Sequence, residues 1–245
     1  MFSYTNIALL CIISACAGFI QRVSGFGLGI FVMLFLPHFM PSHTAAAAIS
    51  GLFSCGTSTY NAVRYRKDIP LKTALPPMIA SMVTIPVAVY FSASVSGNIF
   101  NVLLGSVLIC LSIYFLFFNR HLTIKPTKKN GLIAGALGGT LNGLFSTGGP
   151  PAVLYFTHAT ADNISYFSAI QFYFCITNIY ATLFRAINRV FTAEILIYSL
   201  IGFIACMIGD KIGVYVFDKL DSAKLKTVIY IGMIISGIIM ILGAA

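Results

Sequence analysis

Polar residues and glycines interrupt a long apolar run in the middle of the chain, and their types suit the binding of anions. Residues 135–156 read GALGGTLNGLFSTGGPPAVLYF. Proline is favoured in the first turn of a helix, where its missing N–H would have had no partner. We therefore predict that a helix stops at Ser146–Thr147, breaks at Gly148–Gly149 and restarts at Pro150. Ser146 or Thr147 is then expected to be the N-cap.

The chemistry expected at such a break is the recognition of negative charge. The first N–H groups of the restarted half-helix and the positive end of its dipole form an anion site. The hydroxyls of Ser146 and Thr147 and the amide of Asn142 add donors, and glycines let the backbone approach the ligand closely. No His, Asp, Glu or Cys cluster has a spacing suited to catalysis, so we predict no catalytic residues, no metal site and no cofactor.

A second interruption lies near the N-terminus, where QRVSGFGLG at residues 21–29 breaks an apolar run. Arg22 is costly there unless it is paired or hydrated, and no acidic residue is near it in the sequence. We predict that its guanidinium helps the half-helix N–H groups to hold an anion; the alternative is that it reaches an interface or a carbonyl group. The predicted substrate-binding residues are Arg22, Ser24, Gly25, Gly27, Asn142, Ser146, Thr147, Gly148 and Gly149.

The composition indicates the elements that position these residues. Hydrophobic residues make up 58% of the chain and charged residues 9%, which predicts an all-α polytopic membrane protein. The apolar segments span residues 4–37, 43–62, 70–95, 98–118, 130–157, 163–184, 194–217 and 223–243. The basic residues occupy short connections between them, which is typical of cytoplasmic membrane loops and excludes nucleic acid as the expected partner.

A shift of the sequence by 120 positions suggests an internal repeat. It aligns the two interruptions, pairing Gly29 with Gly149, and it also pairs Cys55 with Cys175. Each interruption is followed by the same pattern of three further apolar segments. We therefore predict two transmembrane repeats, residues 1–120 and 121–245, the second beginning with a basic cytoplasmic connector. Each contains a broken or re-entrant glycine-rich helix followed by three transmembrane helices.

The helix after each interruption carries a stripe of polar residues at helical spacing. These stripes are Ser50, Ser54, Thr57, Asn61 and Arg64, and Gln171, Cys175, Asn178, Thr182 and Arg185. Polar stripes in membrane helices either join helices or line a pathway. Because both stripes directly follow an interruption, we favour a pathway lined by Gln21, Ser54, Thr57, Gln171 and Asn178.

The distribution of positive charge bears on the orientation of the repeats. If each interruption is a re-entrant hairpin, the two repeats have opposite orientations in the membrane. Every Lys and Arg outside the first hairpin then lies on the same side of the membrane, except Arg185 and Arg189. If the broken segments cross the membrane instead, Lys211 and the lysines after it move to the other side. The positive-inside rule favours inverted repeats with both termini outside.

Asp210 is either a proton-coupling carboxylate or, as we prefer, one half of a solvated pair with Lys211.

The two interruptions also carry a family resemblance. AGFIQRVSGFGLG and GALGGTLNGLFSTGGPP resemble the glycine-rich segments that open the repeats of TauE/SafE-type sulfite exporters, and the resemblance covers essentially the whole chain. Arg22 departs from the family pattern, in which a small residue is usual. The resemblance implies a multi-pass transporter of the cytoplasmic membrane for sulfite, sulfonate or sulfoacetate-like anions.

Of three other functions, the sequence leaves a passive anion channel as the alternative and disfavours the other two. A passive anion channel would use the same residues, an intramembrane enzyme would need a catalytic cluster, and a structural membrane protein would not need the interruptions. The expected partners are a small organic or inorganic sulfur anion and membrane lipid, and a homo-oligomer is compatible with the sequence. The exact substrate, the direction of transport and the coupling ion are left open.

Overall fold

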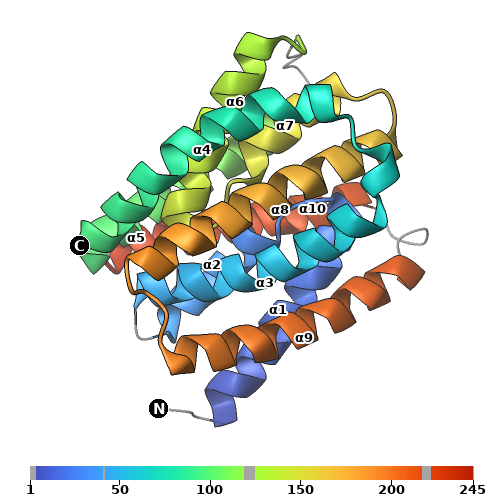
Figure 1. Cartoon of the computed structure of the whole chain (residues 1–245). Helices are drawn as coiled ribbons and strands as arrows, with labels where there is room; N and C mark the ends of the chain where they lie inside the picture. Colours follow the sequence, from blue (N-terminus) through green and yellow to red (C-terminus); the bar gives the residue numbers. More distant parts are fainter. Residues whose placement is uncertain (1–3, 41, 119–124, 217–221, 245) are drawn as a thin grey trace.

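The computed structural model describes residues 4–40, 42–118, 125–216 and 222–244, except for the side chains of residues 24, 118, 216 and 222–229. The described residues form a helical bundle without strands (Figure 1). Its α-helices are α1 (Tyr4–Ser24), α2 (Leu28–Phe35), α3 (His43–Arg64), α4 (Leu71–Ser94), α5 (Gly97–Ile113), α6 (Lys128–Phe145), α7 (Gly149–Ala159), α8 (Asn163–Ile187), α9 (Ala193–Val216) and α10 (Ser222–Leu242). Short helical turns follow α2 at Leu36–His38, α3 at Arg66–Asp68 and α5 at Tyr114–Phe118.

Both predicted interruptions are present. α1 and α2 are separated by residues 25–27, and α6 and α7 by residues 146–148. At the second break the chain turns back, because Gly131 of α6 lies against Tyr155 of α7 and Gly138 lies against Gly148. α2 likewise packs on α1 after the first break. The two broken segments are therefore helical hairpins, α1–α2 and α6–α7.

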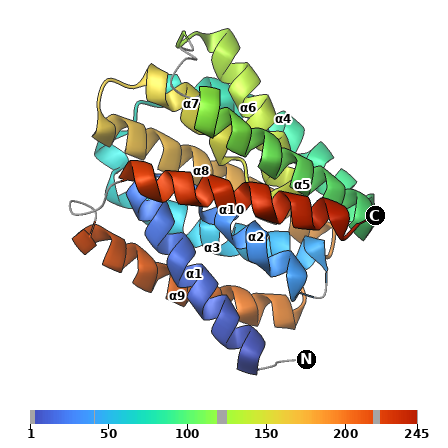
Figure 2. The same ribbon diagram turned by 180° about the vertical axis from the view of Figure 1, so that it is seen from behind.

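Pairs of helices from the two halves of the chain pack along one another (Figures 1 and 2). α4 packs on α6 and α1 on α9, while α3 packs on α8 and α5 on α10. The α1–α2 hairpin thus packs on α9 of the second half, and the α6–α7 hairpin packs on α4 of the first half. These contacts between the halves hold the two hairpins in one bundle.

Glycines allow the closest of these helix pairs. On α6, a Cβ at Gly135, Gly139 or Gly143 would meet the backbone of α4. On α9, a Cβ at Gly209 would overlap the Ala15 carbonyl group of α1. Small residues at helix contacts let backbones approach and gain van der Waals contact. Many glycines of residues 135–156 therefore serve packing, and only those at the break shape the candidate site.

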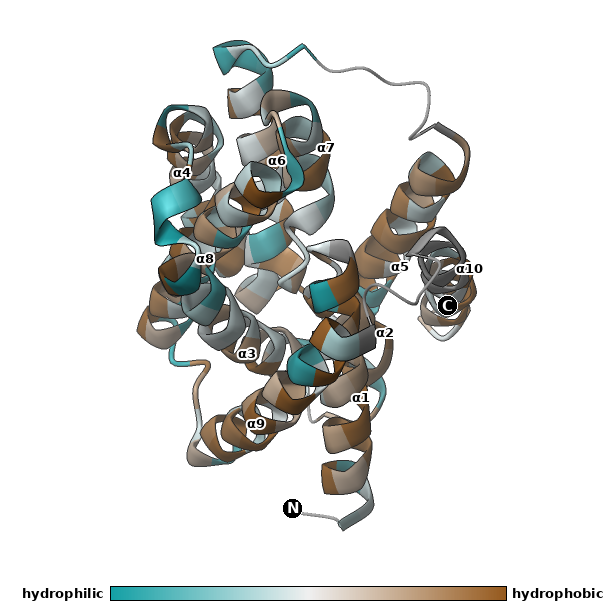
Figure 3. Cartoon of the chain, turned by 90° about the vertical axis from the view of Figure 1, so that its right-hand side faces the viewer, coloured by the Kyte–Doolittle hydropathy of each residue, from teal (hydrophilic) through white to brown (hydrophobic). Residues whose placement is uncertain are grey.

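Five of the described helices are long and apolar enough to cross a membrane, namely Tyr4–Val23, Leu71–Ser94, Gly97–Phe117, Asn163–Ile187 and Ala193–Tyr215. Their outward side chains are apolar; Val83 and Val87 of α4, for example, are each 70% exposed. Figure 3 shows this apolar character along much of α1, α5 and α9, with hydrophilic segments nearer the middle of the bundle and at the start of α6. α3 falls outside this set, because its polar residues lower the mean hydropathy of the helix. Of these, Ser50, Ser54, Thr57 and Asn61 are buried in the protein.

Candidate anion-binding site

The first break is built from two glycines in the left-handed region of backbone conformation. Gly25 has φ 79° and donates its N–H to the Gln21 carbonyl oxygen at 2.8 Å, which ends α1. Gly27 has φ 100° and caps the start of α2. Residues with a Cβ rarely adopt these angles, so the glycines allow the chain to reverse within three residues.

The second break differs from the prediction in its capping residue. Ser146 does not start α7; it ends α6, with φ 56°. Its hydroxyl donates to the Ala47 carbonyl oxygen of α3 at 2.7 Å, and Gly148 is the N-cap of α7 without a side-chain cap. The predicted N-cap role of Ser146 or Thr147 is therefore wrong, because the serine hydroxyl fastens the hairpin to α3 instead.

The tips of the two hairpins meet. A Cβ on Gly29 would overlap the Ser146 carbonyl oxygen, and Gly149 lies against Phe26. Between the tips is a cavity of about 30 Å³, which is room for about two water molecules. It is lined by Gln21, Gly27, Leu28, Gly29, Ile30, Ser54, Asn142, Ser146, Thr147, Gly148, Gly149, Phe174 and Asn178.

Two helix N-termini border this cavity. The first intrahelical bond of α2 runs from the Phe31 N–H to the Gly27 carbonyl oxygen at 2.8 Å. The N–H groups of the three residues before Phe31 therefore have no partner within the helix. In α7 the residues after Gly149 are two prolines, so Gly148 and Gly149 supply the N–H groups at that end. Both N-termini place partial positive charge at the cavity.

The side chains that line the cavity are uncharged hydrogen-bonding groups and apolar groups. Among its described lining residues none is acidic or basic; Gln21, Asn142 and Asn178 contribute amides, and Ser54 and Thr147 contribute hydroxyls. Amides and hydroxyls can donate hydrogen bonds to an anion without forming an ion pair. The cavity can therefore accept negative charge through dipoles alone.

Thr147 carries the most direct sign of a missing ligand. The residue is 2% exposed, and its Oγ1 finds no hydrogen-bond partner among the described residues. Burial of a hydroxyl without a partner is unfavourable, so such groups need an explanation. A bound anion in the cavity would supply the missing acceptor.

The negative ends of the broken helices are compensated. Arg185 of α8 is 4% exposed and donates to the carbonyl oxygens of Asn142 at 2.8 Å and Gly143 at 3.1 Å. These carbonyls lie in the last turn of α6, where the helix dipole is negative. Gln171 donates in a similar way to the Gly25 carbonyl oxygen at 3.1 Å, beyond the end of α1. Because these donors offset the partial negative charge at the C-termini of α6 and α1, less of it cancels the partial positive charge of the two helix N-termini at the cavity.

The structure gathers most of the predicted site residues at the cavity. Of the predicted substrate-binding and pathway residues, those that line it are Gln21, Gly27, Ser54, Asn142, Ser146, Thr147, Gly148, Gly149 and Asn178. Gly25 and Gln171 do not line the cavity, but the hydrogen bond from Gln171 to the Gly25 carbonyl oxygen holds the α1–α2 tip. Gln21 in turn donates to the Gln171 side-chain oxygen at 3.4 Å. Thr57 donates to the Phe53 carbonyl oxygen of its own helix. The side chain of Ser24 lies outside the described residues.

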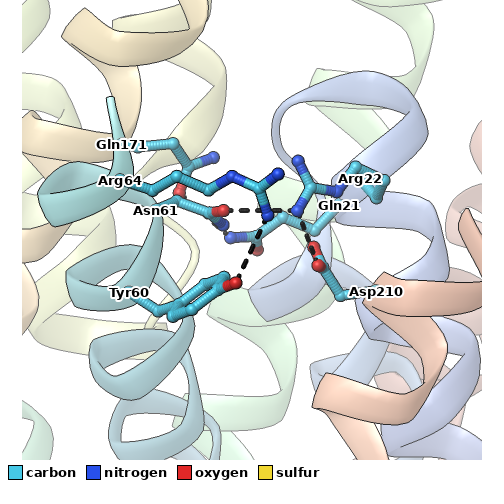
Figure 4. Close-up of polar contacts among 7 residues, drawn as sticks. All are labelled: Gln21, Arg22, Tyr60, Asn61, Arg64, Gln171 and Asp210. Carbon is cyan, nitrogen blue, oxygen red and sulfur yellow. Dashed lines mark hydrogen bonds and ion pairs between the residues drawn. The ribbon is translucent and has the colours of Figure 1, made fainter. Parts of the chain in front are cut away.

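Arg22 does not line the cavity, and it has an acidic partner although no acidic residue is near it in the sequence. Its guanidinium pairs with Asp210 of α9 at 2.6 Å and donates to the Asn61 side-chain oxygen at 3.4 Å (Figure 4). Asp210 is likewise not one half of a solvated pair with Lys211, since its side chain is 6% exposed and bound to Arg22. No spacing in the sequence pairs Asp210 with Arg22, because the two residues are far apart in the chain.

Four lining residues were not predicted, namely Leu28, Gly29, Ile30 and Phe174. The first three follow directly from the position of the break, since they are the first residues of the restarted helix. Gly29 was also the repeat partner of Gly149, which was a usable signal. No pattern in the sequence singled out Phe174.

Comparison with known proteins finds a matching family and a curated relative. The family model described as "Sulfite exporter TauE/SafE" matches residues 10–240, which include both breaks. The probable sulfite/organosulfonate exporter TauE of Cupriavidus necator is 25% identical over 208 residues, covering 80% of this chain and 78% of that protein. No solved structure matches the chain.

Proposed function

This chain belongs to the sulfite exporter TauE/SafE family of membrane transporters, and we propose that it is a secondary transporter for small sulfur-containing anions. The substrate class is sulfite, a sulfonate or sulfoacetate, carried across the cell membrane by alternating access. The single observation that carries this proposal is the cavity where the N-termini of α2 and α7 meet beside the unpartnered hydroxyl of Thr147.

The chemistry of the cavity favours an oxyanion over a cation or a neutral solute. Helix N-termini, amides and hydroxyls all present hydrogens to the ligand, and an oxyanion offers several acceptor oxygens at once. A cation would be repelled by the two helix N-termini, and the described lining includes no carboxylate to offset that repulsion. The relative from Cupriavidus necator is named as a probable sulfite/organosulfonate exporter, which favours a sulfur oxyanion among the candidates.

Two inverted repeats, residues 1–120 and 121–245, are our proposal for the architecture that moves this site. The packing supports it. The contact of α4 with α6 has its counterpart in the contact of α9 with α1, as expected if α1 corresponds to α6 and α4 to α9. The other two pairs, α3 with α8 and α5 with α10, each join corresponding helices of the two halves. Hairpins that enter from opposite sides and meet at the middle would make the chain multi-pass, with the basic connector in the cytoplasm and both termini outside. In such transporters one half rocks against the other around a fixed site.

The size of the cavity favours a carrier over a passive channel. With room for about two water molecules, it has no continuous space for ions to flow through. An anion could bind there only after the hairpins separate, and separation on alternate sides is what alternating access requires.

Transport assays with purified protein in proteoliposomes test this proposal. We expect labelled sulfite, thiosulfate or sulfoacetate to enter the vesicles, to saturate, and to be driven uphill by an opposing gradient of the unlabelled anion. Chloride serves as the comparison solute, and protein-free vesicles as the control. Flux that never saturates and shows no counterflow would indicate a channel, and absence of flux for every anion would refute the proposal.

A further inference from the structure

The ion pair between Arg22 and Asp210 is buried although it lies outside the cavity. The side chains are 10% and 6% exposed, and the distance between Arg22 Nη2 and Asp210 Oδ2 is 2.6 Å. Arg22 Nε is also buried and has no hydrogen-bond partner among the described residues. The guanidinium lies over the ring of Phe167 at 5.6 Å. Arg22 therefore has an unused donor in addition to the one that holds Asp210.

This ion pair is connected to the anion cavity by polar side chains. Gln21, the residue before Arg22, lines the cavity, and Figure 4 shows Gln21, Asn61 and Arg22 side by side. Asn61 belongs to the polar stripe of α3, which includes the cavity residue Ser54 and ends with Arg64. Ten residues of helix span about 15 Å. The stripe thus extends from the cavity past Arg22 to the exposed end of α3.

Other charged groups around Asp210 are few. Arg64 of α3 is exposed, bonds to the Tyr60 hydroxyl at 3.3 Å and contributes positive charge near Asp210. On α9, Cys206 lies one turn before Asp210 and Lys211 follows it. Among the described residues, the acidic member of this cluster is Asp210.

We propose that Asp210 occupies the place of the anion on Arg22 and that its protonation couples transport to protons. When Asp210 binds a proton, Arg22 loses its counter-charge and is left as a buried cation, which is strongly unfavourable. A substrate anion moving along the α3 stripe then replaces the carboxylate on Arg22 before it reaches the cavity. This inference rests on the proposed transport of anions and adds the ion that drives it.

In this exchange one proton from water adds to the Asp210 carboxylate and one anion takes its place on Arg22, so no bond other than the O–H is formed. The exchange is electroneutral for a monovalent anion, and a divalent anion such as thiosulfate adds one net negative charge. Because the proton and the anion each favour the binding of the other, the coupling is reciprocal. The affinity for the anion therefore rises as the pH falls, by up to about tenfold per pH unit for one coupled proton.

The test uses thiosulfate, whose own charge does not change over the pH range of the assay. For the wild type we expect the binding affinity to rise at lower pH, and an inward proton gradient to drive thiosulfate accumulation in vesicles. In Asp210→Asn, which imitates the protonated acid, both effects should be lost while exchange of thiosulfate at equal pH persists. Glu194→Gln, in the first turn of the same helix, is the matched control and should keep both effects.

A second variant keeps the test valid if Asp210→Asn does not fold. The double variant Arg22→Gln/Asp210→Asn removes both charges, so no buried cation remains, and it should show weak, pH-independent binding. Proton-driven accumulation that persists in either variant would overturn the inference. Counterflow at equal pH reports on the proposed transport function separately, so its presence in wild type without any effect of pH would refute the coupling alone.

Discussion

Replacing Thr147 by valine should change the stability of the protein and its affinity for the anion in opposite directions. The Thr147 hydroxyl is buried at the cavity without a partner. A hydrogen bond to a charged acceptor is worth about 1.5–3 kcal/mol, so valine should weaken anion binding by about 10- to 150-fold. A buried hydroxyl without a partner costs about 1–3 kcal/mol, so the ligand-free variant should be more stable, by about 1 kcal/mol.

Thr182 provides a matched control on α8. Its Oγ1 is also buried without a partner, but it does not line the cavity. Thr182→Val should therefore raise the stability of the ligand-free protein and leave anion affinity unchanged. The assay is thermal unfolding with and without thiosulfate, because a ligand that binds the native state raises its stability with the logarithm of the ligand concentration. If Thr147→Val binds thiosulfate as tightly as the wild type, our assignment of the hydroxyl to the ligand is wrong.

Two further substitutions examine the contact of the hairpin tips and the electrostatics behind it. Gly29→Ala should abolish flux and destabilise the protein by about 1–3 kcal/mol, since its Cβ would overlap the Ser146 carbonyl oxygen. Gly232→Ala, where a Cβ meets nothing within 4 Å, should have little effect in the same flux and unfolding assays. Arg185→Gln should weaken anion binding severalfold, because helix-end charges are worth about 0.3–2 kcal/mol; Arg189→Gln is the exposed control, and equal affinities for both variants would contradict this account.

The sequence was sufficient to predict the helical bundle and the two breaks. Glycines and polar residues within apolar runs have few explanations in a membrane, and Pro150 marked the restart of α7 to within one residue. The residues at the break followed from that position. This is why most of the predicted residues, such as Asn142 and Thr147, line the cavity.

What could not be predicted depends on contacts between distant parts of the chain. Asp210 reaches Arg22 from α9, and only the packing of α9 on α1 brings them together. Ser146 was expected to cap α7, but its hydroxyl is used by the Ala47 carbonyl oxygen of α3. Within the α3 stripe, spacing alone could not separate Ser54, which lines the cavity, from Thr57, which bonds to its own helix.

The two prolines after Gly149 make the two walls of the cavity chemically unequal. α2 offers backbone N–H groups through its whole first turn, whereas Pro150 and Pro151 remove two from α7. Thr147 and Asn142 supply side-chain donors on that second wall instead. A ligand would thus meet more backbone N–H groups at the α1–α2 tip and would depend more on side-chain donors at the α6–α7 tip. Substitutions that change selectivity therefore have more scope at the α6–α7 tip.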